Sequence, residues 1–414
     1  MTIREASQGA LLVALALMTA CGSDSGDGAA AAVRDSAGVR IVENSAPLWG
    51  EGEGWRLSGD PIVEIGVLEG APEYQLYRAF DGVRMSDGRI VVANVGTNEL
   101  RVYDSEGRFV KSVGGEGGGP GEFKSIAFVD VFDGDSLVTF DWNNNRSQVF
   151  DPQVEFVRSL RFDPAGEGDA TQLARPVAPF ADGTFLTRVT RGFRPGDPEG
   201  VSRDSVLYLH HDRSGALIDS IGRLPGKETY VKSFTNRSIT VTTLPFGRAP
   251  QLAVHGNDFW FGSSDTYEIR YYTGDGALQR LIRAEEPVTP VTDADIQRFT
   301  EDRLEVASEE WRPRLQQMLD EVSFPEMMPA YSNLVADDAG NLWVADYPGP
   351  VTEAHDSWNV FDPDGRLLGS VDIPPRFLVF QIGADFVLGL HRDEMEVERV
   401  RLYGLEKGTA VTRR

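Results

Sequence analysis

The sequence predicts an all-β protein, a six-bladed β-propeller with a small helical insertion, from three observations. A glycine-led pattern of short apolar strands and polar turns occurs six times, its closest copies lie 46, 49 and 43 residues apart, and a pair of amphipathic stretches interrupts it. Several strands in a unit of about 40 to 50 residues are typical of a propeller blade. The leading glycines are Gly88, Gly134, Gly183, Gly256, Gly340 and Gly383.

Each copy predicts at least two strands of one blade. In the first copy, polar turns separate apolar strands expected at 90–94, 99–103 and 108–114. The other copies predict strands at 137–141 and 147–151, 185–187 and 206–209, 259–262 and 267–271, 342–346 and 358–362, and 386–389 and 397–402. Because the last copy lacks a clear fourth strand, we expect residues 61–66 to supply it and to close the ring between the chain ends.

Residues 285–330 interrupt the strand pattern with two amphipathic stretches. Thr292, followed by Asp295, predicts one helix N-terminus, and Ser308 predicts a second. Apolar residues at helical spacing follow each cap, and Pro325 ends the second helix. The insertion joins the fourth blade to the fifth, so we expect it on the face where inner strands begin, either packed on a blade edge or placed as a lid.

The first blade resembles a known repeat. Residues 87–123, which end in GGEGGGPGEF, resemble an NHL repeat of the six-bladed propeller superfamily. The resemblance is most specific in this blade and extends loosely over residues 75–404. It implies a ring of six blades around a central channel, and it leaves the activity open because propellers host many functions.

The N-terminus resembles a bacterial lipoprotein signal. Residues 10–20 form an apolar run too short to span a bilayer, and the only cysteine of the chain, Cys21, follows directly. The resemblance implies a signal peptide at 1–20, a lipidated flexible tether at 21–37 and the propeller at 38–414. Cys21 is followed by Gly22 and Ser23, and not by the aspartate that favours retention in the inner membrane. We therefore expect a bacterial cell-envelope protein, in the outer membrane and facing the periplasm or the cell surface, with an ordinary secretory signal as the alternative.

The composition argues against several classes of function. There are 40 Lys and Arg against 64 Asp and Glu, and this formal charge of −24 argues against nucleic acid as a partner and against membrane binding other than through the lipid anchor. One cysteine excludes a disulfide framework and a multi-cysteine zinc site. The five histidines do not converge by strand phase. We expect no metal and no cofactor.

Basic residues stand at the start of most inner strands, where the strands surround one mouth of the central channel. They occur in five of the six blades, at Arg78, Lys124, Arg175, Arg248 and Arg376. Converging guanidinium groups repel one another, so such a ring calls for an anion or for acidic neighbours. The sequence therefore predicts either a site for a carboxylate, a phosphate or an acidic peptide, or a set of structural salt bridges.

Two aromatic residues are expected beside this mouth. Trp142 and Tyr347 occupy equivalent connections between second and third strands, and such connections open on the same face as the mouth. Both residues are therefore candidates for flanking a ligand.

These patterns favour recognition over catalysis. The first hypothesis is an envelope-anchored binding or scaffold protein that recognises a protein or a small anionic ligand at the mouth. The alternative is a metal-dependent hydrolase, lactonase or lyase acting in the channel. Lactonase-like propellers hold a divalent cation with inward Glu, Asn and Asp, and NHL-type lyases hold zinc with three inward histidines. The inner strands carry no clear equivalent of either set, so no catalytic residue is assigned.

Overall fold

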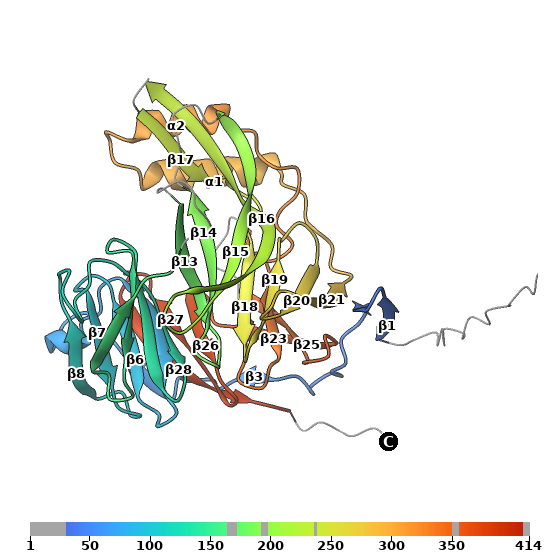
Figure 1. The fold of residues 1–414 in the computed structure, drawn as a ribbon. Helices are drawn as coiled ribbons and strands as arrows, with labels where there is room; N and C mark the ends of the chain where they lie inside the picture. The colour runs from blue at the N-terminus through green and yellow to red at the C-terminus, as the bar shows by residue number, and fades with distance from the viewer. Residues whose placement is uncertain (1–29, 164–171, 192–197, 236–237, 350–355, 409–414) are drawn as a thin grey trace, which may run out of the picture.

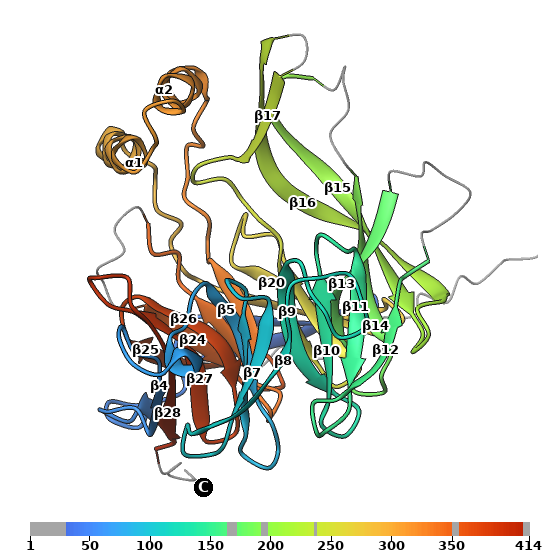
Figure 2. The ribbon, with the colours of Figure 1, turned by 90° about the vertical axis from the view of Figure 1, so that its left-hand side faces the viewer.

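The computed structural model describes residues 30–163, 172–191, 198–235, 238–349 and 356–408. Its strands form six sheets, and each sheet is built mainly from consecutive segments of the chain (Figure 2). One cavity is lined by residues from the innermost strand of every sheet, so the six strands surround a common centre. These inner strands are β5 (Ala79–Arg84), β9 (Ile126–Phe132), β13 (Gln172–Pro179), β18 (Gln251–His255), β22 (Asn333–Ala336) and β26 (Phe377–Ile382). The predicted six-bladed propeller is confirmed.

The remaining strands complete the blades in chain order. Blades 1 and 2 add β6 (Ile90–Asn94), β7 (Glu99–Tyr103), β8 (Phe109–Gly114), β10 (Ser136–Asp141), β11 (Arg146–Phe150) and β12 (Phe156–Leu160). Blades 3 and 4 add β14 (Phe185–Arg191), β15 (Gly200–His211), β16 (Leu217–Thr235), β17 (Ser238–Thr243), β19 (Asp258–Gly262), β20 (Glu268–Thr273) and β21 (Leu278–Ala284). Blades 5 and 6 add β23 (Leu342–Ala345), β24 (Asp356–Phe361), β25 (Leu367–Ile373), β27 (Phe386–Arg392) and β28 (Glu398–Glu406). A short 3₁₀ turn, η1 (Pro72–Tyr74), precedes β5.

A recurring aspartate fixes the turns between the outer strands. Oδ1 of Asp104 accepts hydrogen bonds from the backbone amides of Glu106 and Arg108, at 3.1 and 2.8 Å. The same two contacts recur at Asp151, Asp212 and Asp362. An aspartate that satisfies the amides of its own turn sets the register of the hairpin, which explains why the polar turns repeat in phase with the strands.

The ring is closed by the N-terminal part of the chain. β4 (Val63–Ile65) pairs with β28, with Val63 opposite Leu402 and Ile65 opposite Val400. β3 (Arg56–Leu57) extends the same edge through Leu57 and Leu405. The closing strand expected at 61–66 is therefore confirmed, and blade 6 combines strands from both ends of the described chain.

A second N-terminal segment corrects the expected tether. Residues 31–36, which we assigned to the tether, form strand β1 (Ala31–Ser36), which pairs with β2 (Val39–Asn44). Ala37 and Gly38 join them with positive φ angles of 51° and 82°, the conformation of a tight hairpin turn. β2 then runs parallel to β21, so this hairpin extends the outer edge of blade 4. Cys21 lies outside the described residues.

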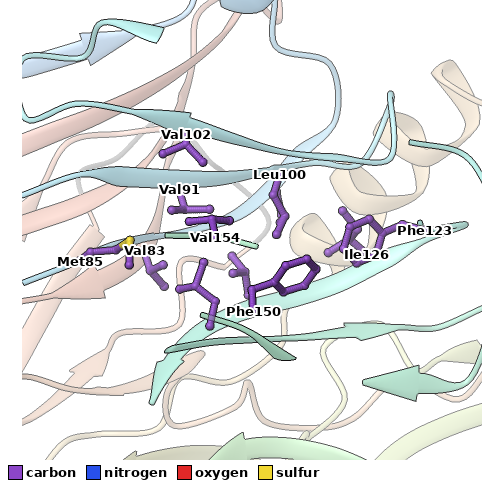
Figure 3. Close-up of a cluster of buried hydrophobic side chains, with 12 residues drawn as sticks. Val83, Met85, Val91, Leu100, Val102, Phe123, Ile126, Phe150 and Val154 are labelled. Carbon is purple, nitrogen blue, oxygen red and sulfur yellow. The ribbon is translucent and has the colours of Figure 1, made fainter. Parts of the chain in front are cut away.

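The cores lie between neighbouring blades. Figure 3 shows one of them, in which Val91 and Leu100 of blade 1 meet Phe123, Ile126 and Phe150 of blade 2. Val91, Leu100, Phe123 and Phe150 are fully buried. Each blade presents two apolar faces, so burial between neighbours stabilises the ring and holds the inner strands at fixed spacing around the channel.

The helical insertion and an extended hairpin of blade 3 pack on each other above the ring. α1 (Asp293–Glu305) and α2 (Arg312–Glu321) lie against the extended β16–β17 hairpin of blade 3 (Figure 1). Met318 is buried with Tyr230 and Leu244, and the rings of Phe299 and Phe246 are 5.3 Å apart. The helices therefore pack on this hairpin, whose strand β17 is the edge of the blade 3 sheet, so the expectation that they pack on a blade edge is confirmed.

One of the two predicted helix N-termini is confirmed. Thr292 and Asp295 form the expected capping box. The second helix begins at Arg312 with Pro313 in its first turn, and the Ser308 hydroxyl instead accepts from the Trp311 amide in the preceding turn, at 3.3 Å. Of the helices in the described ranges, none has the length and apolar character that crossing a membrane requires.

Candidate ligand-binding site

A cavity of about 620 Å³ opens where the inner strands of blades 1, 2 and 3 begin, and we call it the mouth pocket. Four arginines line it, and no residue in its described lining is acidic. The four are Arg78, Arg175, Arg188 and Arg392. A protein of net charge −24 thus has a locally cationic cavity, whose volume falls within the range of small-molecule sites.

The centre of the mouth pocket is a stack of Arg175 on Trp142. The guanidinium carbon lies 3.7 Å from the centroid of the indole, a cation–π contact, and Nε donates to Oδ1 of Asn145 at 3.4 Å. Arg188 is the direct cross-strand partner of Arg175. Burial, and then the charge of Arg188, lower the pKa of Arg175. Neither arginine forms an ion pair with a carboxylate among the residues that the structure describes.

Aromatic rings also line the mouth pocket. Trp142, Phe140 and Phe128 follow one another at centroid distances of 6.2 and 6.4 Å. Trp142 is 45% exposed and Phe80 is 55% exposed, so two large apolar surfaces face solvent beside the arginines. The mouth pocket therefore combines positive charge with uncovered aromatic surface, which suits an anion that carries an apolar part.

Arg78 and Arg392 belong to the junction of blades 6 and 1. Arg392 forms an ion pair with Glu398 at 3.1 Å, and the other carboxylate oxygen of Glu398 accepts from the Ala79 amide at 2.7 Å. Arg78, directly before β5, has a left-handed backbone with φ of 55°, and its side chain is exposed. Glu398 thus neutralises Arg392 in part and fixes the start of β5, which positions Arg78 at the rim.

Three of the seven residues expected at the mouth line this pocket. They are Arg78, Trp142 and Arg175. Arg248 instead forms ion pairs with Glu228 and Asp265, both at 3.2 Å, and Arg376 donates to the carbonyl oxygen of Asp393 at 2.9 Å. Lys124 and Tyr347 do not line the mouth pocket either.

Arg188 and Arg392 were not expected from the sequence. Both lie on the second strand of a blade, β14 and β27, whereas the sequence pattern directed attention to the starts of inner strands. A signal was present for Arg188, because it stands nearly as far after the Asp182-Gly183 turn as Arg175 stands before it. Strands joined by a tight turn place such residues opposite each other.

A second cavity of about 600 Å³ shares Trp142 and Arg188 with the mouth pocket, and we call it the side pocket. Val189 of β14, residues 204–207 of β15 and residues of β16 line it, with Ala249 and Pro250 from the start of blade 4. The two cavities are therefore adjacent, with Trp142 and Arg188 between them.

The opposite ends of the inner strands surround a third cavity of about 690 Å³, the lower cavity. Asp130, Asp135, Asp338 and Asp385 are among its lining residues. Burial raises the pKa of Asp130 to about 7, and burial together with the neighbouring Asp130 raises that of Asp81, within the channel wall, to about 7. Within the described ranges, no three His, Cys, Asp or Glu side chains are grouped so as to hold a metal ion.

The fold and its two mouths define a six-bladed β-propeller, and comparisons with known proteins agree with this class. A family profile, DUF5128, described as a 6-bladed beta-propeller, matches residues 72–168, which span blades 1 and 2. No curated protein matches the chain.

Solved structures share the fold at low identity. A member of the DUF4221 family from Bacteroides vulgatus is 11% identical, with 86% of this chain and 99% of that chain covered and a TM-score of 0.52. A gluconolactonase from Xanthomonas campestris is 14% identical over 80% of this chain and 87% of its own, with a TM-score of 0.42. Regucalcin, a calcium-binding protein from Agrobacterium tumefaciens, is 9% identical over 85% and 96%, with a TM-score of 0.38. At these identities the likeness describes the fold alone.

Proposed function

We propose that this protein is an envelope-anchored binding protein that recognises an anionic ligand in the mouth pocket. One observation carries the proposal. Four arginines line a cavity whose described lining contains no acidic residue, in a chain with a net charge of −24. Structural salt bridges account for Arg248 and Arg376, but they do not account for Arg175 and Arg188 among the described residues.

The energetics of the arginine pair favour an anion. Arg175 and Arg188 are opposite each other in the β13–β14 ladder, and like charges in that relation destabilise a sheet. A bound carboxylate or phosphate removes the repulsion and accepts charge-assisted hydrogen bonds, which are about twice as strong as neutral ones. Arginine suits this role because its planar fork can bind an oxyanion with two parallel bonds.

The aromatic surface narrows the class of ligand. Trp142 and Phe80 leave exposed ring surface next to the guanidinium groups. An inorganic anion would cover the charges alone, whereas a carboxylate or phosphate on an apolar body would cover both. The proposed ligand is therefore an organic anion or an acidic segment of a protein.

The anchor belongs to the same proposal. The lipoprotein-type signal at 1–20 and acylation of Cys21 would hold the propeller at a membrane of the bacterial envelope, and the NHL-type resemblance of the first blade accords with a recognition module. Two or more acyl chains are needed for stable anchoring.

A matched pair of variants tests the site. Arg78 and Arg376 both directly precede an inner strand with a left-handed backbone, at φ of 55° and 56°, but only Arg78 lines the mouth pocket. We compare R78Q/R175Q with the control R376Q by thermal shift against citrate, benzoate, phenyl phosphate and oligoglutamate. A ligand that binds only the native state raises stability by about 2.7 kcal/mol at a hundred times its Kd.

The expected result is a rise in Tm for the wild type and for R376Q, and its loss in R78Q/R175Q. The proposal fails if no anion shifts the wild type, or if R78Q/R175Q responds as strongly as R376Q. Titration calorimetry on the same proteins checks that the shift reports binding.

A further inference from the structure

Blade 3 splits into two ribbons at the side pocket. β14 pairs with β15 only from Phe185 to Val189, opposite residues 207–211. Beyond Val189, β14 continues alongside β13, whereas β15 continues alongside β16, up to Gly200 opposite Val231. The second ribbon rises toward α1 and α2 (Figure 1). The two ribbons therefore diverge at Val189 and Leu207, and the side pocket lies in this fork.

Among the described residues, the fork leaves one edge of β15 without a partner strand. Residues 200–206 pair with β16 on one side, and on the other side the structure describes no strand beside them. Val201, Asp204 and Ser205 are exposed, so this edge is accessible within the described chain. A strand edge with unpaired N–H and C=O groups is a template on which another extended chain can form a ladder.

The side chains around the edge select for negative charge. Arg188, Arg223 and Lys227 line the side pocket, against one acidic residue, Asp204. Val189, Val206 and Leu207 add apolar surface between them. A peptide with alternating acidic and apolar side chains matches both features, because successive residues of a strand face opposite sides.

The side pocket and the mouth pocket are neighbours. They share Trp142 and Arg188, and each has the volume of a complete small-molecule site. A single small anion would fill one of them, whereas an extended chain would span both. An acidic oligosaccharide could supply the charge and the length, but it has no regular row of amide donors and acceptors to pair with β15.

Building on the proposed anion site, we propose that the ligand is an acidic peptide segment of a partner protein, which adds to the free edge of β15 as a strand. Its acidic side chains meet Arg188 and Arg223, and one end of the segment enters the mouth pocket beside Arg175. Backbone pairing gives affinity in this mode, and the arginines select acidic sequences.

The experiment uses an eight-residue peptide of alternating Glu and Val with blocked ends. Two analogues carry N-methyl groups, one on every Glu and one on every Val, so each removes the amide donors of one edge of the peptide strand. Hydrogen exchange of residues 200–206 is followed with each peptide, and affinities are measured by calorimetry. The expected result is slower exchange in 200–206 with the parent peptide, and at least a tenfold loss of affinity for one analogue but not for the other.

Two further arms separate this inference from the proposed function. R223Q/K227Q should weaken the parent peptide about tenfold and leave citrate and phenyl phosphate binding unchanged, because these two residues line only the side pocket. Oligogalacturonate of equal charge serves as the saccharide probe.

The outcomes are distinguishable. If citrate or phenyl phosphate binds in an Arg175-dependent manner but the peptide leaves exchange in 200–206 unchanged, the strand-addition inference is overturned and the proposed function stands. Tighter binding of oligogalacturonate than of the peptide also overturns it. If neither the small anions nor the peptide binds, both the inference and the proposed function fail.

Discussion

Arg175 and Arg188 are direct cross-strand neighbours in the β13–β14 ladder, and both side chains line the mouth pocket. A sheet selected for stability alone would not place two guanidinium groups opposite each other, because the pair repels. Burial lowers the pKa of Arg175, and the charge of Arg188 lowers it further. Local conflicts of this kind are expected where function, and not folding, determines the residue.

Replacing one member of the pair should stabilise the free protein. Arg188→Gln removes the repulsion but keeps the stack of Arg175 on Trp142. We expect the free energy of unfolding to rise by about 0.2 to 1 kcal/mol at low salt, the size of a cross-strand pair effect. The gain should shrink at high salt, because ions screen the repulsion in the wild type. Urea denaturation at two salt concentrations measures it.

Arg203→Gln is the matched control on the same blade. Arg203 donates to both carboxylate oxygens of Asp265, at 2.7 and 2.9 Å, so its loss should destabilise the protein. If Arg188→Gln destabilises the free protein as Arg203→Gln does, the arginine pair is not a conflict in the fold, and this interpretation is wrong.

Closure of the ring should depend strongly on the three-residue strand β4. Ile65 of β4 is 1% exposed and packs into the core between blades 6 and 1, whereas Ile62, three residues earlier, is 65% exposed. Ile65→Ala should cost about 2 to 5 kcal/mol, the range for buried large-to-small changes. Ile62→Ala should change stability by no more than about 0.5 kcal/mol.

Both variants are compared by calorimetric unfolding. Since β4 joins the N-terminal segment to β28, its weakening should also broaden the transition as cooperativity around the ring falls. Equal stability of the two variants would contradict the role of β4 as the closing strand.

The fold was predictable because its signals are local and repeated. Blades 1, 2, 3 and 5 each have a turn such as Asp104 to Arg108, whose hydrogen bonds lie within five residues, and six glycine-led units in phase leave few alternatives. The closing strand followed from the same reasoning, since a missing strand in the last blade must be supplied. The hairpin of β1 and β2 was missed because its pairing with β21 joins segments about 240 residues apart.

The site was only partly predictable, because it depends on strand register and on insertions in neighbouring blades. The starts of inner strands correctly indicated Arg78 and Arg175, but Arg248 sits beside Glu228 of the extended β16 ribbon and pairs with it. The contribution of β14 required the register of Arg175 with Arg188, which a β-bulge shifts between Pro176 and Ala178. Long insertions and bulges move side chains in ways that a repeat pattern does not record.

The proposed anchor makes a prediction about location. Cys21→Ala removes the only thiol of the chain, so no acyl chain can be attached. Expressed in a bacterium with its own signal, the wild type should partition into detergent and sediment with membranes, whereas Cys21→Ala should lose membrane association. Cell fractionation and mass spectrometry of the mature N-terminus measure this. Membrane association that persists in Cys21→Ala would contradict the lipoprotein proposal.

The channel carboxyl groups predict how stability depends on pH. The pKa values of Asp81 and Asp130 are about 7 in the folded protein, against an ordinary value of 3.8, mainly because both groups are buried. Between about pH 4 and pH 7 the folded state therefore holds protons that the unfolded chain has released. Stability falls as pH rises through this window, by up to about 1.4 kcal/mol per pH unit for each group, and levels off above pH 7.

Asp130→Asn tests this pH dependence better than Asp81→Asn does. Oδ1 of Asp130 accepts one hydrogen bond, from the Val131 amide at 2.8 Å, and an asparagine can keep it. Asp81 accepts from the Gly82 and Val129 amides with different oxygens, so an asparagine there would lose one of the two. We expect Asp130→Asn to flatten the fall in stability, to exceed the wild type at pH 8 and to equal it near pH 4.

Asp219→Asn provides the control for loss of one negative charge. Asp219 accepts from the next amide, Ser220, at 2.7 Å, just as Asp130 does from Val131, but it is exposed on β16. Removing a charge from a chain of net −24 should affect both variants alike, so only the buried group should alter the pH profile. Urea unfolding at pH 4, 6 and 8 gives the pH dependence of the free energy of unfolding for the wild type and for each of the two variants. If Asp130→Asn and Asp219→Asn follow the same profile, Asp130 is ionised in the native protein well below pH 7, and the burial argument for the channel is wrong.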